Sequence, residues 1–160
     1  MVGTGYDSHA FEENLPFILG GIKIDAPFGC RAHSDGDALM HALVDALLGA
    51  MGKGDIGELY PDTDDKFKNA DSSRFLTETI YLMKSLFYEI VNIDITILLE
   101  KPKLKEYKAL IRENLAKLCG IETGLINIKA KTNERMGFVG RSEGIAVLCV
   151  CQIEKPAKSE

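Results

Sequence analysis

The sequence predicts an α+β fold in which a mixed or antiparallel sheet carries helices on one face, in a ferredoxin-like arrangement. One observation is that apolar residues follow helical spacing in three segments, while other segments alternate or are rich in β-branched residues. A second is the order of the second half, where a strand, a helix and two strands follow one another. A third is the length of 160 residues, which suits one domain with a sizeable core. We therefore expect one domain over residues 1–154 and a flexible C-terminal tail over residues 155–160.

The first half is expected to contain a strand, a hairpin and a long helix. The strand covers about residues 1–7, and the hairpin turns at Gly20-Gly21 between two apolar runs. Apolar residues at helical spacing predict a helix within residues 35–55, which a pair of glycines ends. A polar loop follows over residues 59–73.

The second half is expected to add two helices and three strands. An amphipathic pattern predicts a helix over residues 73–90, and Gly120 closes another over residues 104–120. The strands are expected over residues 91–100, 125–132 and 144–153.

Composition argues against several classes of protein. The net charge of -5 disfavours nucleic acid as the main partner, because a phosphate backbone requires a basic surface. No apolar run is long enough to span a membrane, and no signal peptide precedes Gly3. The four cysteines form no CxxC pair, so we expect buried thiols in a reducing compartment. These features predict a cytoplasmic bacterial protein, or the processed form of a protein of an organelle stroma.

Five ionisable residues suggest a metal site. Asp7 and His9 lie two apart, so a strand would place them on one face. His41 lies on an otherwise apolar helix, with Asp37 and Asp45 four residues to either side. Because such groups need partners, we predict that Asp7, His9 and His41 bind zinc with an open fourth position, the pattern of catalytic zinc. Asp37 or Asp45 would not touch the metal but would orient one of the side chains that bind it.

Each of these interpretations has an alternative. Asp7 and His9 could form a hydrogen-bonded pair or simply a polar strand end, and a histidine on an apolar helix is more often a satisfied boundary residue. Asp37 and Asp45 could cap or solvate the helix.

Two loops carry groups that suit a phosphorylated ligand. His33 and Ser34 directly precede the long helix. The stretch KAKTNERMGFVGR follows a predicted strand and combines basic and hydroxyl side chains with glycines that allow tight turns. Side chains and backbone N–H groups of such a loop can hold phosphate. The lysines of LLEKPKLK offer further positive charge, although a solvated charge run is the simpler interpretation.

Four stretches of the chain closely resemble the family of 2-C-methyl-D-erythritol 2,4-cyclodiphosphate synthases. They are GTGYDSHAF, AHSDGDALMHALVDALLGAMGKGDIGELYPDTD, LEKPKL and KAKTNERMGFVGRSEGIA. The resemblance runs from residue 2 to about residue 153, and the central block is long and specific.

The resemblance implies a homotrimer with active sites between neighbouring subunits. It implies one zinc ion per subunit on Asp7, His9 and His41, and a second cation, Mg²⁺ or Mn²⁺, held by Glu134 and the substrate phosphates. A prenyl diphosphate can occupy the trimer axis in family members.

The resemblance also assigns a cytidine diphosphate substrate and residues that contact it. His33 and Thr132 match positions that stabilise the transition state, and Phe138 and Arg141 match positions that face the trimer axis. Tyr60 and Lys131 fall at variable positions. The expected substrate contacts are Ser34, Asp55, Ile56, Gly57, Tyr60, Pro61, Asp62, Thr63, Asp64, Leu99, Glu100, Lys101, Pro102, Lys103, Leu104, Lys105, Ala130, Lys131, Phe138 and Arg141.

The reaction that the resemblance implies is the cyclisation of 4-diphosphocytidyl-2-C-methyl-D-erythritol 2-phosphate with release of CMP, in the non-mevalonate pathway. Two cations would neutralise the phosphoryl group and hold it in line. A zinc-dependent phosphate-ester hydrolase could use the same ligands with an activated water. A metal-stabilised assembly protein without catalysis is a third possibility.

Overall fold

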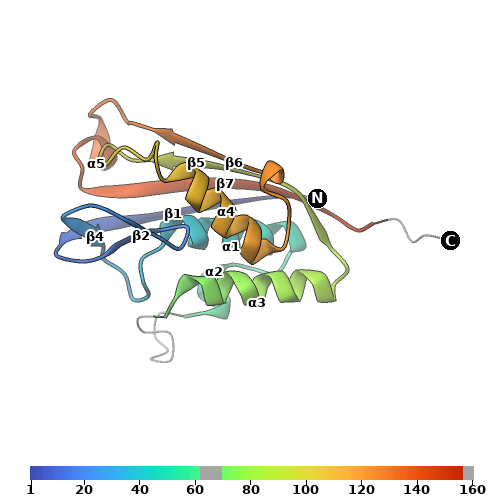
Figure 1. Cartoon of the computed structure of the whole chain (residues 1–160). Coiled ribbons are helices and arrows are strands. Elements are labelled where there is room, and N and C mark those ends of the chain that lie inside the picture. The colour runs from blue at the N-terminus through green and yellow to red at the C-terminus, as the bar shows by residue number, and fades with distance from the viewer. Residues whose placement is uncertain (62–69, 157–160) are drawn as a thin grey trace.

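The computed structural model describes residues 1–61 and 70–156 and shows a five-stranded sheet with helices stacked on one face (Figure 1). The sheet order is β4-β1-β7-β5-β6, and β2 pairs with β3 in a separate hairpin. The strands are β1 (Val2–Glu13), β2 (Phe17–Leu19), β3 (Ile22–Ile24), β4 (Phe28–Cys30), β5 (Glu89–Leu98), β6 (Ile126–Lys131) and β7 (Gly144–Glu154). The helices are α1 (Ala38–Met51), α2 (Ile56–Leu59), α3 (Ser72–Ser85), α4 (Lys108–Cys119), η2 (Thr123–Leu125) and α5 (Gly137–Gly140).

The sheet is mixed, as the sequence predicts. Neighbouring strands run antiparallel, except that β5 and β6 are parallel and α4 lies in the connection between them. Parallel strands need such a crossover because a short turn cannot reverse the chain twice. β1 pairs with β7 over most of its length, and its last residues pair with β4.

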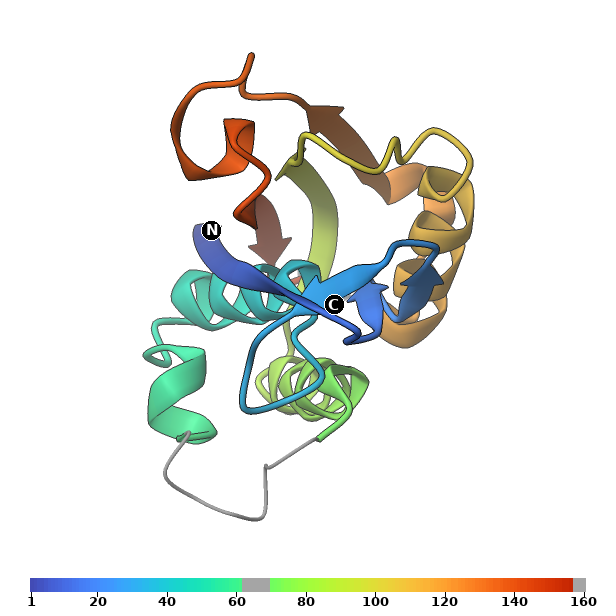
Figure 2. The ribbon, with the colours of Figure 1, turned by 90° about the vertical axis from the view of Figure 1, so that its left-hand side faces the viewer.

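The helices form a second layer over one face of this sheet. α1 packs on β1 and β7, α3 packs on α1, and α4 lies near β6 and α3 (Figure 2). The apolar core fills the space between the two layers, and Leu39, Leu43 and Leu47 of α1 are fully buried in it. The expected arrangement of helices on one face is therefore confirmed.

Two glycines of β1 let α1 lie directly on the strand backbone. A Cβ atom on Gly5 would lie 1.9 Å from the carbonyl oxygen of Ala42, and one on Gly3 would lie 1.9 Å from that of Ala46. Both contacts are with helix backbone, which cannot rotate away as a side chain can. The approach of α1 to β1 therefore requires glycine at both positions.

The predicted elements are present, but several boundaries were wrong. The first strand runs to Glu13 and not to residue 7, because residues 8–10 continue the ladder with β7. Residues 11–13 then pair with β4, a strand that the sequence did not reveal. The helix expected over residues 73–90 ends at Ser85, because Phe87 adopts a left-handed conformation with φ of 60° and the chain then enters β5. Helix α4 begins at Lys108, four residues later than expected. The short helices α2 and α5 were not predicted.

The expectations drawn from composition can also be compared with the structure. All four cysteines are free and buried, and burial raises the pKa of Cys30 and Cys119 to about 12, so these thiols are unreactive. Among the described residues, none of the helices has the length and apolar character that a membrane span requires.

We predict that Gly5→Ala lowers the free energy of unfolding by at least about 1–3 kcal/mol, the usual cost of overpacking a core. The added methyl group would meet the backbone of Ala42, so α1 must move away from the sheet. Gly124→Ala is the matched control, since a Cβ atom there would have no neighbour within 4 Å. Urea unfolding of both variants measures the difference, and equal stability would refute the close-packing argument.

Candidate metal centre and substrate pocket

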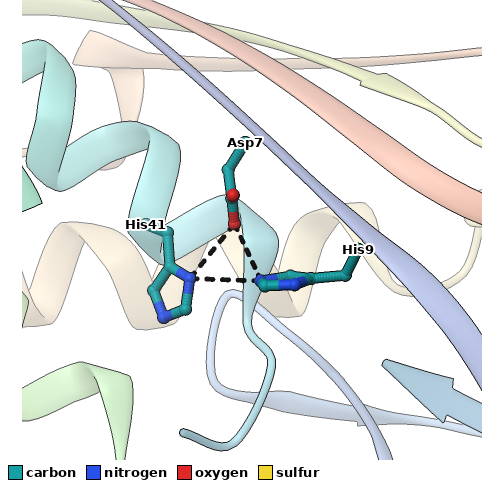
Figure 3. A group of neighbouring side chains, drawn as sticks. All are labelled: Asp7, His9 and His41. Atoms are coloured by element: carbon teal, nitrogen blue, oxygen red, sulfur yellow. Dashed lines mark hydrogen bonds and ion pairs between the residues drawn. The ribbon is translucent and has the colours of Figure 1, made fainter. Parts of the chain in front are cut away.

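Three side chains from two elements meet at one point: Asp7 and His9 of β1, and His41 of α1 (Figure 3). Asp7 Oδ2 lies 2.9 Å from His9 Nε2 and 3.1 Å from His41 Nδ1, and the two nitrogens are 3.3 Å apart. All three side chains are partly buried. The structure thus brings together the three residues that the sequence selected.

The local sequence explains this meeting. Residues 3, 5, 7 and 9 of β1 share the face toward the helices, because side chains alternate along a strand. The glycines at 3 and 5 admit the helix, and the next two positions on that face carry the carboxylate and the imidazole. His41 lies in the first turn of α1, where the helix passes this part of the strand.

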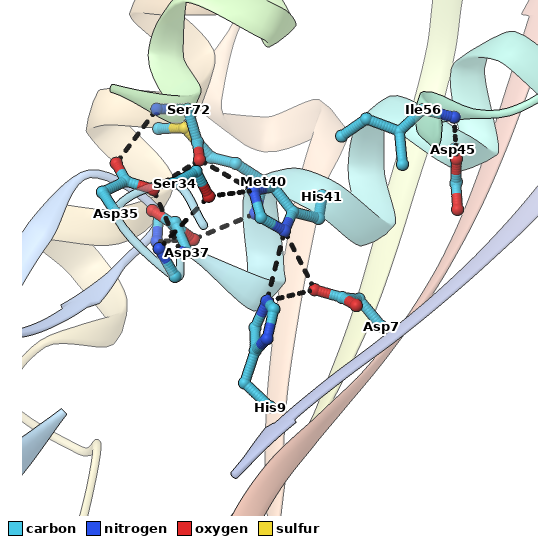
Figure 4. A network of polar contacts seen from close by, with 12 residues as sticks. Asp7, His9, Ser34, Asp35, Asp37, Met40, His41, Asp45, Ile56 and Ser72 are labelled. Atoms are coloured by element: carbon cyan, nitrogen blue, oxygen red, sulfur yellow. Dashed lines mark hydrogen bonds and ion pairs between the residues drawn. The ribbon is translucent and has the colours of Figure 1, made fainter. Parts of the chain in front are cut away.

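The far nitrogen of His41 is held by a chain of hydrogen bonds (Figure 4). His41 Nε2 lies 2.9 Å from Ser72 Oγ, and the Ser72 hydroxyl donates to Asp35 Oδ1 at 2.5 Å. Because that hydroxyl hydrogen points to Asp35, its oxygen accepts the Nε2 hydrogen. In neutral His41 the Nδ1 lone pair is then left for a cation, whereas in protonated His41 Nδ1 carries a hydrogen toward Asp7 Oδ2. Metal-binding histidines are oriented in this way by a partner on the other ring nitrogen.

The charges of the cluster suit a cation. Burial alone would raise the pKa of Asp7, but hydrogen bonds with His41 and His9 outweigh burial and lower the pKa from 3.8 to about 2. Burial would lower the pKa of His41, but the hydrogen bond to Asp7 and the nearby carboxylates raise it. The site therefore favours positive charge beside an ionised carboxylate. Two imidazole nitrogens and one carboxylate oxygen form a donor set that zinc accepts.

The carboxylates of Asp37 and Asp45 hold backbone amides. Asp37 is fully buried at the N-terminus of α1 and accepts from Met40 N, Gly20 N and Gly21 N at 2.7–3.0 Å. It therefore caps the helix and fixes the β2–β3 turn. Asp45 accepts from Ile56 N at 2.7 Å and so fixes the start of α2. These hydrogen bonds favour capping for Asp37, the alternative to its expected role behind a metal ligand.

The three-residue cluster opens into a pocket of about 460 Å³. His33, Ser34, Ile56, Gly57, Tyr60 and Pro61, all expected at the substrate, line it together with Asp7, His9, Arg31, Ala32, His41 and Phe75. His33 Nε2 is buried and has no hydrogen-bond partner among the described residues, so it can bind a ligand group. The Ser34 hydroxyl lies 3.2 Å from His41 Nε2. Arg31 was missed, although a basic residue two positions before His33 is a usable signal for phosphate.

The remaining expected residues of this region have other positions. Asp55 caps α2 by accepting from Glu58 N at 2.9 Å. Asp62, Thr63 and Asp64 lie outside the described residues. A larger and more apolar cavity of about 960 Å³ lies at the ends of α3 and α4, and Phe87, Tyr88 and Leu125 are among the residues that line it.

The residues expected at the nucleotide lie apart from this pocket, at the ends of β5 and β6. Thr132 Oγ1 donates to Glu134 Oε1 at 2.6 Å, and Glu100 accepts from two backbone amides of the same loop. Lys101, Lys103, Lys105 and Lys131 are exposed, and Pro102 and Ala130 are half-buried. Leu99 and Leu104 belong to the apolar core, so only their backbone groups are available to a ligand. None of the described residues that line the metal pocket comes from residues 99–105 or 130–134.

The chain is similar to known proteins over nearly its whole length. The YgbB family matches residues 1–154. The chain is 51% identical over 154 residues to a 2-C-methyl-D-erythritol 2,4-cyclodiphosphate synthase of Brachyspira hyodysenteriae, covering 96% of this chain and 98% of that protein. It is 49% identical to the bifunctional enzyme IspD/IspF of Aliarcobacter butzleri, covering 96% of this chain. The chain spans only about two fifths of the length of this and other bifunctional relatives. A solved 2C-methyl-D-erythritol-2,4-cyclodiphosphate synthase in its CDP-bound form is 36% identical with a TM-score of 0.89, covering 96% of this chain and all of that one.

We predict that Ser72→Ala weakens zinc binding by about 10–100-fold, the usual effect of removing a partner from a metal-binding histidine. His41 Nε2 loses the nearer of its two hydroxyl partners, Ser72 Oγ at 2.9 Å, and keeps Ser34 Oγ at 3.2 Å. Ser73→Ala is the matched control, because it makes the same change one residue along the same helix. Zinc affinity is measured by competition with a chelator, and equal affinities of the two variants would refute the role of Ser72.

Proposed function

The chain belongs to the YgbB family, and from this premise we propose that it acts as a 2-C-methyl-D-erythritol 2,4-cyclodiphosphate synthase. It would cyclise 4-diphosphocytidyl-2-C-methyl-D-erythritol 2-phosphate and release CMP, in the non-mevalonate pathway to isoprenoid precursors. The observation that carries the proposal is the cluster of Asp7, His9 and His41 in the wall of a pocket, together with a His33 Nε2 that has no hydrogen-bond partner within the described part of the chain. The relative of the same name matches over nearly its whole length.

Two cations would complete the site. Asp7, His9 and His41 would hold one zinc ion per subunit, and Glu134 would hold Mg²⁺ or Mn²⁺ together with the substrate phosphates. The donor sets support this division, because two imidazoles suit zinc and an exposed carboxylate suits a hard cation. When bound, the cations supply positive charge that offsets the charge of the phosphates.

The residues of the chain would fold the substrate so that its own 2-phosphate meets its diphosphate. An oxygen of the 2-phosphate attacks the β-phosphorus and forms the ring. The bond from the β-phosphorus to the bridging oxygen breaks, and CMP leaves with that oxygen. The attacking phosphate is already an anion, so no general base is required. His33 Nε2 would donate a hydrogen bond to the phosphoryl oxygens as charge develops. The Thr132 hydroxyl would do the same once its hydrogen turns from Glu134 Oε1 to the phosphate.

The substrate would span two parts of the surface. The pocket residues Ser34, Ile56, Gly57 and Tyr60 would bind the methylerythritol phosphate end, with Asp55 nearby. The loops at the ends of β5 and β6 would hold the cytidine diphosphate end. A solved structural relative in its CDP-bound form supports a nucleotide partner.

We infer that three chains assemble into a ring. The sheet face that points away from the helices exposes Val2, Tyr6, Leu148 and Val150, and Tyr6 lies opposite Leu148 in the β1–β7 ladder. A contiguous apolar surface of this kind suits burial against another subunit. A head-to-tail contact around a three-fold axis closes into a ring.

The ferredoxin-like description of the subunit also stays a prediction.

The trimer axis would hold Phe138 and Arg141. Phe138 is partly exposed, and the Arg141 guanidinium pairs with Glu143 at 2.8 and 3.1 Å. A prenyl diphosphate at the axis would therefore have to share Arg141 with Glu143.

Turnover of the proposed substrate tests the function. The protein is incubated with the substrate, Zn²⁺ and Mg²⁺, and we expect CMP and the cyclic diphosphate in equal amounts. His41→Ala should lose most activity because it removes a zinc ligand. Inorganic phosphate or a linear water-cleaved product would instead show a zinc-dependent phosphate-ester hydrolase.

Mixed trimers test whether each site lies between chains. His41→Ala and Glu134→Gln, each inactive alone, are unfolded together and refolded at equal amounts. Suppose that the two halves of a site come from neighbouring chains. The metal half is intact only in a Glu134→Gln chain and the nucleotide half only in a His41→Ala chain. Each has an even chance of being present, so about one site in four is whole. Activity should then reappear. Native mass spectrometry verifies that the subunits have mixed, and inactive mixed trimers would place each site within one chain.

A further inference from the structure

The carboxylate of Glu100 connects the end of β5 to the loop that follows β6. Strands β5 and β6 are parallel with Leu98 beside Lys131, and Leu99 N donates to Lys131 O at 2.9 Å. Glu100 therefore lies next to the loop as it leaves the sheet. Its Oε2 accepts from Asn133 N at 3.0 Å, and its Oε1 accepts from Arg135 N at 3.3 Å. Each carboxylate oxygen thus binds a separate amide of one short loop.

That loop has a backbone conformation that its sequence does not favour. Glu134 and Arg135 both have positive φ angles, of 50° and 64°. Residues with a Cβ atom rarely adopt this left-handed conformation, and two in succession are costlier than one. Such strain persists only where surrounding contacts hold it. Hydrogen bonds from amides to an ionised carboxylate are strong enough to help stabilise this left-handed conformation.

The opposite side of the loop is held by close packing. A Cβ atom on Gly140 would lie 2.2 Å from the carbonyl carbon of Arg135, so α5 packs directly on the loop backbone. The loop is therefore clamped between Glu100 and Gly140. In this conformation Thr132 Oγ1 reaches Glu134 Oε1 at 2.6 Å.

We propose that Glu100 is a positioning residue that holds residues 133–135 so that Thr132 and Glu134 point at the reacting phosphates. This differs from its expected role as a substrate contact, because both carboxylate oxygens face amides of the loop. An anionic side chain is also a poor direct contact for a diphosphate. The inference rests on the proposed function for its catalytic consequence, although the clamp itself does not depend on a substrate.

Glu100→Ala and Glu100→Gln test the clamp in the substrate-free protein. We expect the amide hydrogens of Asn133 and Arg135 to exchange about tenfold faster or more in the alanine variant, because two charge-assisted hydrogen bonds are lost. The glutamine variant keeps one acceptor oxygen. Its amide exchange rates should therefore lie between those of the alanine variant and the wild type. Glu106→Ala, an exposed residue of the same segment, is the matched control and should leave both amides unchanged.

Kinetics separate positioning from substrate binding. We expect Glu100→Ala to lower kcat about tenfold or more and to raise the Mg²⁺ concentration needed for half activity, with zinc content unchanged. Partial rescue by Glu100→Gln is expected. Unchanged amide exchange, or a rise in KM alone with kcat and the Mg²⁺ requirement intact, would overturn the proposal. If the alanine variant does not fold, amide exchange in the glutamine variant tests the proposal. Exchange as slow as in the wild type would then overturn it. Failure of the wild type to form the cyclic product would refute the proposed function and leave the exchange result valid.

Discussion

The candidate site depends on the contact between the backbone of β1 and the backbone of α1. Gly3 and Gly5 remove the side chains that would otherwise hold the two elements apart. Because side chains alternate along a strand, the same face continues with Asp7 and His9. His41 then lies within hydrogen-bond distance of Asp7 although it is 34 residues away in sequence. The close contact at the glycines therefore also places Asp7 and His9 beside His41.

Carboxylates around this contact divide into two groups by what they bind. Asp7 faces the two imidazoles and is available to a cation. Asp37 and Asp45 bind backbone amides and fix the hairpin turn and the start of α2, while Asp35 binds the Ser72 hydroxyl. A buried carboxylate without such donors would be costly. The acidic residues near the metal pocket thus hold loops from distant parts of the chain in place around it.

Local patterns in the sequence were enough to predict that Asp7, His9 and His41 meet, because strand alternation and a lone histidine on an apolar helix both leave a visible signal. The partners of Asp37 left no such signal, since the Gly20 and Gly21 amides reach it only after the hairpin folds onto α1. The end of α3 was misjudged because the stretch from Leu86 to Val91, apolar or aromatic except for Glu89, fits a helix or a strand equally well. The left-handed turn at Phe87 decides between them, and that position does not carry the expected glycine.

The distance between the two candidate half-sites follows from the strand order. β1 carries Asp7 and His9 of the candidate metal site and β6 leads to Thr132 and Glu134, with β7 and β5 between these two strands. Three strand spacings of about 4.8 Å separate β1 from β6 by roughly 14 Å across the sheet. Rotating the side chains within one chain does not bring the three-residue cluster and Glu134 close enough to contact the same phosphoryl group. In the proposed trimer, the gap would be bridged across the interface between chains, where the three-residue cluster of one chain would face the Thr132–Glu134 loop of its neighbour. This separation supports the proposal that the active site lies between chains, with the metal half on one chain and the nucleotide half on the next.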